Sequence, residues 1–224
     1  MNRTRQPSPL QSEALRFALA LLAAAWFTGA ALAGTPSIAG AEANEGWSLE
    51  LQQDGIDVYT RPVEGSGIKE FKGVAVVDAS IDGILSLLRD SSRFKTWFPN
   101  TAESKLLGRE GDYSYQYSVM ALPWPMSNRD NVLRSIFTRN QETGVVDITI
   151  VAAPDYHPVQ EGLVRVQKAR GTWRLEPLGE HKTHVMFAMH LEPGGGIPQW
   201  MINARIVATP FEALTNLRAK VAGQ

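Results

Sequence analysis

The stretch Leu122-Pro-Trp-Pro-Met-Ser-Asn-Arg-Asp130 sets the interpretation of the whole sequence. Its two prolines fix φ and cannot donate hydrogen bonds to a sheet, so the stretch separates two strands and does not lie within one. The same bend holds a tryptophan and, at its end, an adjacent arginine and aspartate. Core packing seldom needs this combination, which makes the bend the first place to look for a functional site.

Apolar residues on both sides of the bend alternate with a period of two, which predicts strands over 113–120 and 131–139. Asp54-Gly55 between alternating apolar residues predicts a hairpin. Consecutive strands of this kind are typical of a meandering antiparallel sheet. The same pattern, interrupted by turn residues, predicts further strands over 68–77, 104–108, 145–153, 163–177 and 184–191.

Two segments follow the helical period instead. Residues 78–90 are expected to form a short helix with Ser80 or Asp78 as its cap. Residues 200–221 are expected to form a long amphipathic helix that Pro210 kinks. A curved antiparallel sheet and a long helix must bury their apolar faces on each other. The sequence therefore predicts an α+β fold whose interior is either filled by side chains or left partly open.

The N-terminus has the pattern of an export signal. After three arginines, an uncharged run from Phe17 to Ala33 ends in Ala-Leu-Ala, the small-x-small pattern that signal peptidase cuts. We predict a secretory signal peptide over 1–33, a flexible leader over 34–45 and one domain over 46–224. A second small-x-small pattern at 41–43 leaves the cleavage point open. The alternative is an N-terminal membrane anchor, because an apolar run of this length is at the lower limit for spanning a bilayer.

The composition excludes several classes of function. The chain has no cysteine, and so no thiol nucleophile, cysteine-ligated zinc or iron–sulfur cluster. An alanine-rich signal without cysteine fits a bacterial periplasm. The formal net charge of −1 argues against nucleic acid as a partner and against tight docking on anionic lipid. The four histidines lack metal-ligand spacing, so neither a metal nor another cofactor is expected.

Five short motifs follow one another in the order of a known family. They are Trp47 with Asp54-Gly-Ile-Asp-Val-Tyr59, Trp97-Phe-Pro-Asn100, Pro123-Trp-Pro125 with Arg129-Asp130, Gly171-Thr-Trp173 before Leu175-Glu-Pro177, and Glu192-Pro-Gly-Gly-Gly-Ile-Pro-Gln-Trp200. With these motifs the chain, from Trp47 to about Val221, resembles the steroidogenic-acute-regulatory-protein-related lipid transfer domain, the START domain.

The resemblance implies a helix-grip fold of the START/Bet v 1-like kind, a curved antiparallel sheet wrapped around a long C-terminal helix that encloses a hydrophobic tunnel. Family members carry one sterol, phospholipid, ceramide or similar lipid there without covalent chemistry, and the C-terminal helix and a loop between strands act as a lid. We therefore expect a monomeric carrier of one apolar ligand that contacts membranes transiently and is not an enzyme.

Two other functions stay open. The wider superfamily includes aromatase/cyclases, and a cyclase-like enzyme would need an acid or base in the tunnel, with Glu103, Arg129 or Tyr117 as candidates. An exported location argues against polyketide chemistry, because those chains are built in the cytosol. An interaction module that merely uses the fold would have a tunnel filled by side chains.

The candidate ligand-binding residues are large apolar or charged side chains near bends, on the last strand and on the last helix, and each could instead belong to ordinary packing. They are Trp97, Phe98, Glu103, Tyr117, Trp124, Met126, Arg129, Asp130, Phe187, Met189, Met201, Ile202, Arg205 and Ile206. Either face of the last strand could line a tunnel.

The charged candidates each have two interpretations. Arg129 and Asp130 either place a charge near the tunnel for a polar head, or form an ion pair that pins the bend. Some sterol-binding family members have a glutamate at the position of Glu103 that faces an arginine on a neighbouring strand. Here that place is Ser135, and Arg134 beside it must point to the other face. The chain thus departs from the sterol-type pair.

Overall fold

The computed structural model describes residues 46–222, apart from the side chain of Ala204. The predicted signal peptide and leader, at 1–33 and 34–45, lie outside the described residues. None of the described helices is long and apolar enough to cross a membrane.

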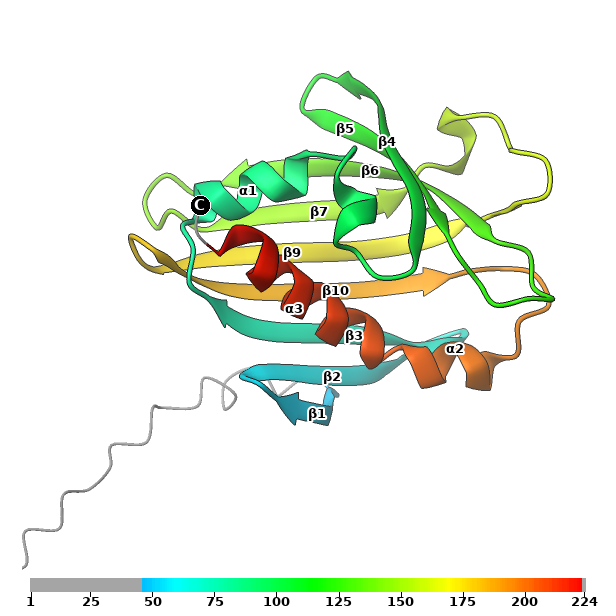
Figure 1. Ribbon diagram of the computed structural model, residues 1–224, viewed down its shortest axis with the longest axis horizontal. Coiled ribbons are helices and arrows are strands. Elements are labelled where there is room, and N and C mark those ends of the chain that lie inside the picture. Colours follow the sequence, from blue (N-terminus) through cyan, green and yellow to red (C-terminus); the bar gives the residue numbers. More distant parts are fainter. Residues whose placement is uncertain (1–45, 223–224) are drawn as a thin grey trace, which may run out of the picture. The chain divides into compact units, whose positions relative to one another are not determined.

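The described residues form one curved sheet of ten strands, in the order β1-β2-β3-β10-β9-β7-β6-β5-β4, with β8 paired to β6 (Figure 1). All pairs are antiparallel except β6 with β8. The sheet is not closed, because β1 and β4 are its edges. The strands are β1 (Ser48–Gln53), β2 (Ile56–Val63), β3 (Ser66–Val77), β4 (Thr101–Glu110), β5 (Tyr113–Met120), β6 (Arg129–Arg139), β7 (Val146–Ala152), β8 (Val164–Arg165), β9 (Lys168–Gly179) and β10 (Lys182–Glu192).

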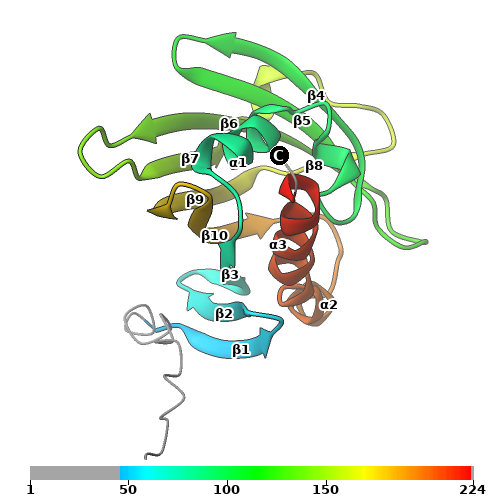
Figure 2. The same ribbon diagram turned by 60° about the vertical axis from the view of Figure 1, so that its left-hand side comes forward.

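Three helices lie in the hollow of this sheet (Figure 2). They are α1 (Ile81–Arg89), α2 (Gln199–Arg205) and α3 (Ala208–Val221), with two short 3-10 turns, η2 (Phe94–Thr96) and η3 (Pro154–Tyr156). The Ser80 Oγ atom accepts a hydrogen bond from the Gly83 N–H at 3.2 Å and caps α1, as one of the two predicted caps. The predicted antiparallel sheet with C-terminal helices against it is thus present.

The Asp54-Gly55 hairpin between β1 and β2 is confirmed. Both residues have positive φ, 52° and 65°, as a two-residue turn with the twist of its strands requires. Arg218 of α3 holds this turn, since its Nη1 and Nη2 atoms donate to the Asp54 and Gly55 carbonyls at 2.6 and 2.8 Å. The last helix is therefore attached to the first hairpin.

The predicted single C-terminal helix is wrong in one respect, because the chain forms two helices. The break lies at Ile206–Val207, not at Pro210, where the kink was expected. Proline has no N–H, so the Ile206 carbonyl four residues earlier loses its helical partner. The interruption therefore falls one turn before the proline.

The predicted strand over 163–177 is also divided. Val164–Arg165 pairs parallel with Arg129–Asp130 at the start of β6, and β9 starts only at Lys168. The cause is the length of β7, which ends opposite Leu133 of β6. The first residues of β6 thus have a free edge, which β8 covers.

Helix α3 approaches the sheet most closely at Gly73 of β3. A Cβ atom at Gly73 would lie 2.9 Å from both the Leu214 Cδ1 atom and the Pro210 Cβ atom of α3. Leu214 and Leu217 of α3 are fully buried in the main core. Glycine at position 73 therefore sets the distance between α3 and β3.

A Gly73→Ala variant is expected to lower the free energy of unfolding by about 1–3 kcal/mol, because α3 must move away from β3. The matched control is Gly83→Ala in α1, where the new Cβ would meet the Ser80 Oγ atom only at 3.4 Å. That control should leave stability unchanged or raise it by up to about 1 kcal/mol. Urea unfolding measures both, and equal stability of Gly73→Ala and the parent would contradict the close contact.

Candidate functional site

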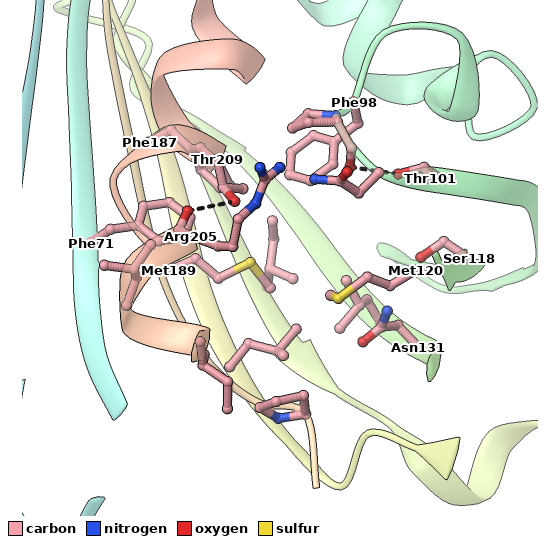
Figure 3. Close-up of a pocket in the computed structure, with 18 of the residues that line it drawn as sticks. Phe71, Phe98, Thr101, Ser118, Met120, Asn131, Phe187, Met189, Arg205 and Thr209 are labelled. Atoms are coloured by element: carbon pink, nitrogen blue, oxygen red, sulfur yellow. Dashed lines mark hydrogen bonds between the residues drawn. The ribbon is translucent and has the colours of Figure 1, made fainter. Parts of the chain in front are cut away.

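A cavity of about 460 Å³ lies between the hollow face of the sheet and the C-terminal helices. This volume is within the range of small-molecule sites. Figure 3 shows side chains from several strands and from α2 and α3 converging on it. Its apolar lining includes Phe71, Leu88, Phe94, Phe98, Met126, Leu133, Phe137, Ile148, Ile150, Trp173, Phe187, Met189, Leu191, Ile197, Met201, Ile202 and Ile206.

The last strand presents one face to this cavity. Phe187, Met189 and Leu191 of β10 line it, at every second position. The Phe187 ring stacks on Trp173 of β9 at a centroid distance of 4.0 Å and meets Phe71 of β3 edge-on at 5.2 Å. These rings form a rigid apolar wall. The inward face of β10 is therefore the one that carries Phe187, Met189 and Leu191.

Strand β5 is turned the opposite way from what its sequence suggested. Gln116, Ser118 and Met120 line the cavity, whereas Tyr117 and Val119 pack into a second apolar cluster behind the sheet. Burial, reinforced by the nearby charge of Asp130, raises the pKa of the Tyr117 phenol to about 12. The prediction that Tyr117 lines the cavity is therefore wrong, because its side of β5 packs into this second cluster and the side with Gln116 and Ser118 faces the cavity.

Two buried polar residues lie on the part of the cavity wall that β5 and β6 form. Asn131 of β6 is 5 % exposed, and its Oδ1 atom has no hydrogen-bond partner in the described part of the protein. Ser118 is its partner across β5 and β6 and is also 5 % exposed. Sequence reasoning missed both. The signal that could have found them is the polar alternation of Gln116 and Ser118 between tyrosines, next to a polar residue at the start of β6.

Charge is confined to two of the described lining residues, Lys69 and Arg205. Lys69 donates through Nζ to Glu50 and Thr60, both at 3.2 Å. The Arg205 side chain is 55 % exposed, and its Nη2 atom lies 3.9 Å from a carboxylate oxygen of Glu212. Both cations are therefore partly solvated. Among the described residues, no three histidine, cysteine, aspartate or glutamate side chains are grouped to hold a metal.

Eight of the fourteen candidate residues line the cavity, and six do not. The lining residues are Phe98, Met126, Phe187, Met189, Met201, Ile202, Arg205 and Ile206; the others are Trp97, Glu103, Tyr117, Trp124, Arg129 and Asp130. Contact of the eight with a ligand stays a prediction.

The two tryptophans lie outside the lining for opposite reasons. Trp97 is buried beneath Phe98 and meets Phe94 and Trp173 edge-on, with centroid distances of 5.3 and 6.3 Å. It supports the wall from behind. Trp124, between its two prolines, is 92 % exposed. A side chain of that size in water does not stabilise the fold, so packing does not explain it.

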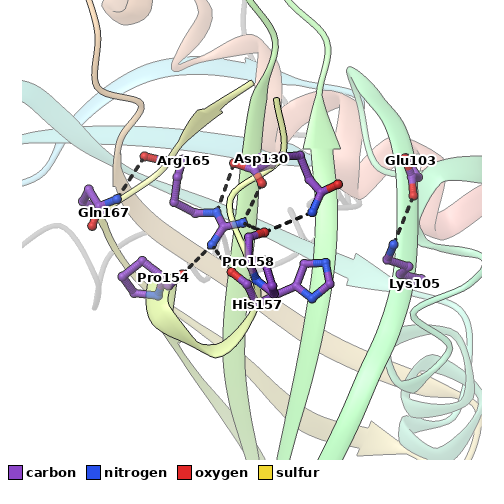
Figure 4. Close-up of polar contacts among 9 residues, drawn as sticks. Glu103, Lys105, Asp130, Pro154, His157, Pro158, Arg165 and Gln167 are labelled. Carbon is purple, nitrogen blue, oxygen red and sulfur yellow. Dashed lines mark hydrogen bonds and ion pairs between the residues drawn. The ribbon is translucent and has the colours of Figure 1, made fainter. Parts of the chain in front are cut away.

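Glu103 faces away from the cavity although Thr101, two residues earlier on β4, lines it. A bulge between these residues reverses the alternation. The Glu103 carboxylate is half exposed and lies 3.6 Å from the Lys105 Nζ atom (Figure 4). Ser135 lines the cavity, and Arg134 instead stacks on Tyr113 at 4.6 Å. The acid–arginine pair of sterol-binding relatives is therefore absent from this part of the structure.

Comparison with known proteins places this geometry in a family. The START domain model matches residues 38–222. The chain belongs to the START domain family. An uncharacterized protein of Pseudomonas aeruginosa is 36 % identical over 182 residues, which cover 81 % of this chain and 90 % of that protein. A phosphatidylcholine transfer protein of Mus musculus is 28 % identical over 174 residues, covering 75 % of this chain and 78 % of that protein.

A solved structure shows the same fold. The crystal structure of a STAR-related lipid transfer protein from Xanthomonas axonopodis is 39 % identical, with a TM-score of 0.74, and the match covers 80 % of this chain and 99 % of that chain. The helix-grip fold expected from the START motifs is therefore confirmed. The mouse protein and the Xanthomonas protein are both named as lipid transfer proteins.

The START arginine–aspartate couple does not form an ion pair with itself, which corrects one prediction. Neighbouring residues of a strand point to opposite faces. The buried Arg129 guanidinium donates to backbone carbonyls only, those of Ser127, Pro193 and Gly194, the last at 3.0 Å. Burial lowers the pKa of this guanidinium. Arg129 thus ties the β5–β6 bend to the loop between β10 and α2.

Asp130 pairs instead with Arg165 of β8 (Figure 4). The Arg165 Nε and Nη2 atoms donate to the two Asp130 carboxylate oxygens at 3.1 and 2.7 Å. The same guanidinium donates to the carbonyls of Pro154, His157 and Pro158. The two side chains are 3 % and 0 % exposed. This pair, on the far side of the strand from Arg129, fixes the loop that carries η3.

Replacing Arg165 with methionine leaves the Asp130 carboxylate buried without its cation, and we expect the free energy of unfolding to fall by about 3–5 kcal/mol. Arg174→Met is the control, since Arg174 is 40 % exposed where it pairs with Asp147; it should cost about 1 kcal/mol or less. Chemical unfolding at neutral pH compares the two. Similar losses in both variants would argue that Asp130 is accessible to water.

Proposed function

We propose that this protein binds one lipid in its cavity and carries it, chemically unchanged, through an aqueous compartment between membranes or to a partner. The observation that supports this most is the apolar cavity of about 460 Å³ beneath α2 and α3. A packed domain does not leave apolar space of this size empty without cost. The names of its relatives, among them a phosphatidylcholine transfer protein and a STAR-related lipid transfer protein, point to the same function.

The driving force for uptake is hydrophobic. Each CH₂ group that moves from water into such a cavity gains about 0.8 kcal/mol. Release needs a membrane or partner that offers the lipid an equivalent environment. The carrier therefore needs no chemical energy of its own, and the distribution of lipid between donor and acceptor sets the direction of net transport.

The alternative of a cyclase-like enzyme has less support. General acid–base catalysis requires a titratable group within hydrogen-bond reach of the substrate. The described lining contains no aspartate, glutamate, histidine, cysteine or tyrosine. Of the three acid–base candidates, Glu103 faces solvent, Tyr117 packs behind the sheet, and Arg129 is held by backbone carbonyls.

Export is part of this proposal. The arginines, apolar run and small-x-small pattern of residues 1–33 support cleavage and release into a periplasm. An aqueous gap between two membranes is where a lipid carrier is useful. A monomer suffices, because a single chain supplies every wall of the cavity described above.

The full chain, produced in a bacterium with two membranes and purified from its periplasmic fraction, should carry one lipid per protein in native mass spectrometry. Denaturation should release that lipid unchanged. The purified protein should also move labelled lipid between vesicles. Lipid-free protein that neither takes up nor transfers any lipid would contradict the proposal, and release of a converted product would favour the enzyme.

Membrane contact is proposed to occur through two uncharged segments that border the cavity, 121–128 and 193–203. Each carries an exposed tryptophan, Trp124 at 92 % and Trp200 at 69 %. Arg129 binds carbonyls of both segments and holds them side by side. Tryptophan favours the membrane–water interface, and the absence of charge removes a desolvation cost. These features support docking of this edge on a neutral bilayer.

The double variant Trp124→Ser/Trp200→Ser should bind neutral phosphatidylcholine vesicles at least about tenfold more weakly, since two large apolar side chains no longer enter the interface. Vesicle co-flotation measures this. Leu178→Ser is the control, because Leu178 is also exposed but lies near the β9–β10 turn, at the other end of β10 from segment 193–203. Equal loss in the control, or none in the double variant, would contradict this docking edge.

A further inference from the structure

The wall of the cavity formed by β5 and the start of β6 is polar, which is unusual for an enclosed face of a sheet. Gln116, Ser118 and Asn131 point inward, and the apolar alternate residues of β5 pack behind the sheet. Antiparallel strands normally bury their apolar face on the enclosed side. Departures from such local rules concentrate at functional sites. This reversal therefore calls for a polar group inside the cavity.

Asn131 shows what that group must be. Its Oδ1 atom is a hydrogen-bond acceptor, it is buried, and it has no partner among the described residues. Buried acceptors are nearly always satisfied in folded proteins, because an unmade hydrogen bond is costly. In Figure 3 Asn131 and Ser118 lie across the cavity from Phe71, Phe187 and Met189, which offer no donor. A molecule that occupies the cavity can supply the missing donor.

We propose that the carried lipid has a neutral hydrogen-bond donor, a hydroxyl or an amide N–H, that binds to the Asn131 Oδ1 atom beside Ser118. The inference rests on the proposed lipid carriage and specifies the chemical class of the lipid. The apolar part of the lipid then lies against the wall formed by Phe187, Met189 and Trp173.

A charged head group fits this wall poorly. A quaternary ammonium head has no N–H or O–H to donate to Asn131. A buried phosphate would need a cation or several donors. The cations of the described lining, Lys69 and Arg205, are both partly exposed, and Lys69 is already bonded to Glu50 and Thr60.

The test uses two probes with the same hydrocarbon chain, hexadecanol and its methyl ether, which replaces the hydroxyl hydrogen with a methyl group and cannot donate. They compete with an environment-sensitive naphthylamine dye bound to the full chain. The wild-type protein should bind the alcohol about tenfold more tightly than the ether. In Asn131→Leu the two affinities should become about equal. Ser135→Ala, four residues further along the same strand and also in the lining, should keep the tenfold preference.

A second measurement separates a binding role from a structural one. Because Asn131→Leu removes an unpaired buried acceptor, the unliganded variant should have a melting temperature equal to or above that of the wild type. A lower melting temperature together with an unchanged preference for the alcohol would overturn the inference. So would equal affinity of the wild type for alcohol and ether, which leaves carriage intact. Failure of the dye and both probes to bind would overturn carriage itself.

Discussion

The close approach of α3 to β3 is the constraint on which the rest of the structure depends. Gly73 lets the helix lie directly on the strand, and Arg218 fastens its C-terminal half to the β1–β2 turn. The helix therefore packs on β2 and β3, and α1 packs against it and against β9. Because one helix cannot cover a sheet of ten strands, the hollow in front of β5, β6 and β7 remains. The cavity lies between this concave face and the C-terminal helices, with Thr209 of α3 and Phe71 of β3 also in its lining.

The two-residue period of the strands predicted the elements well and the cavity lining less well. It located the hairpin and the sheet, because those strands are regular, but it left open which face of β10 is inward. It failed where a bulge changes the alternation and where the apolar side of a strand faces away from the cavity. A bulge in β4 turns Glu103 outward. Tyr117 packs into the second apolar cluster behind the sheet and does not line the cavity. Neither event leaves a mark in local sequence that composition alone can detect.

The bend from Leu122 to Asp130 is anchored on two sides. Because Arg129 and Asp130 are neighbours on a strand, they anchor opposite sides of it. Arg129 holds the two loops at the edge of the cavity through their carbonyls, and Asp130 with Arg165 holds the η3 loop. The sequence left open a charge near the cavity or an ion pair between the two residues, since it shows which residues are adjacent but not which strand covers the free edge of β6. Because the contacts of Arg129 and Asp130 hold the bend, the Trp124 side chain is not needed for packing and is exposed to solvent.

The proposed lipid carriage requires a protein that is stable both with and without its ligand, and the polar wall affects the stability of both states. The unliganded protein has an apolar hollow and an unpaired acceptor at Asn131, and both lower its stability relative to a filled core. Any ligand that binds only the folded state raises stability by mass action. A ligand that fills the apolar hollow and donates to Asn131 would remove both defects, and the free energy recovered would contribute to its affinity. A cavity filled by larger side chains would lack both defects, so the folded protein would be more stable and would have no room for the proposed ligand.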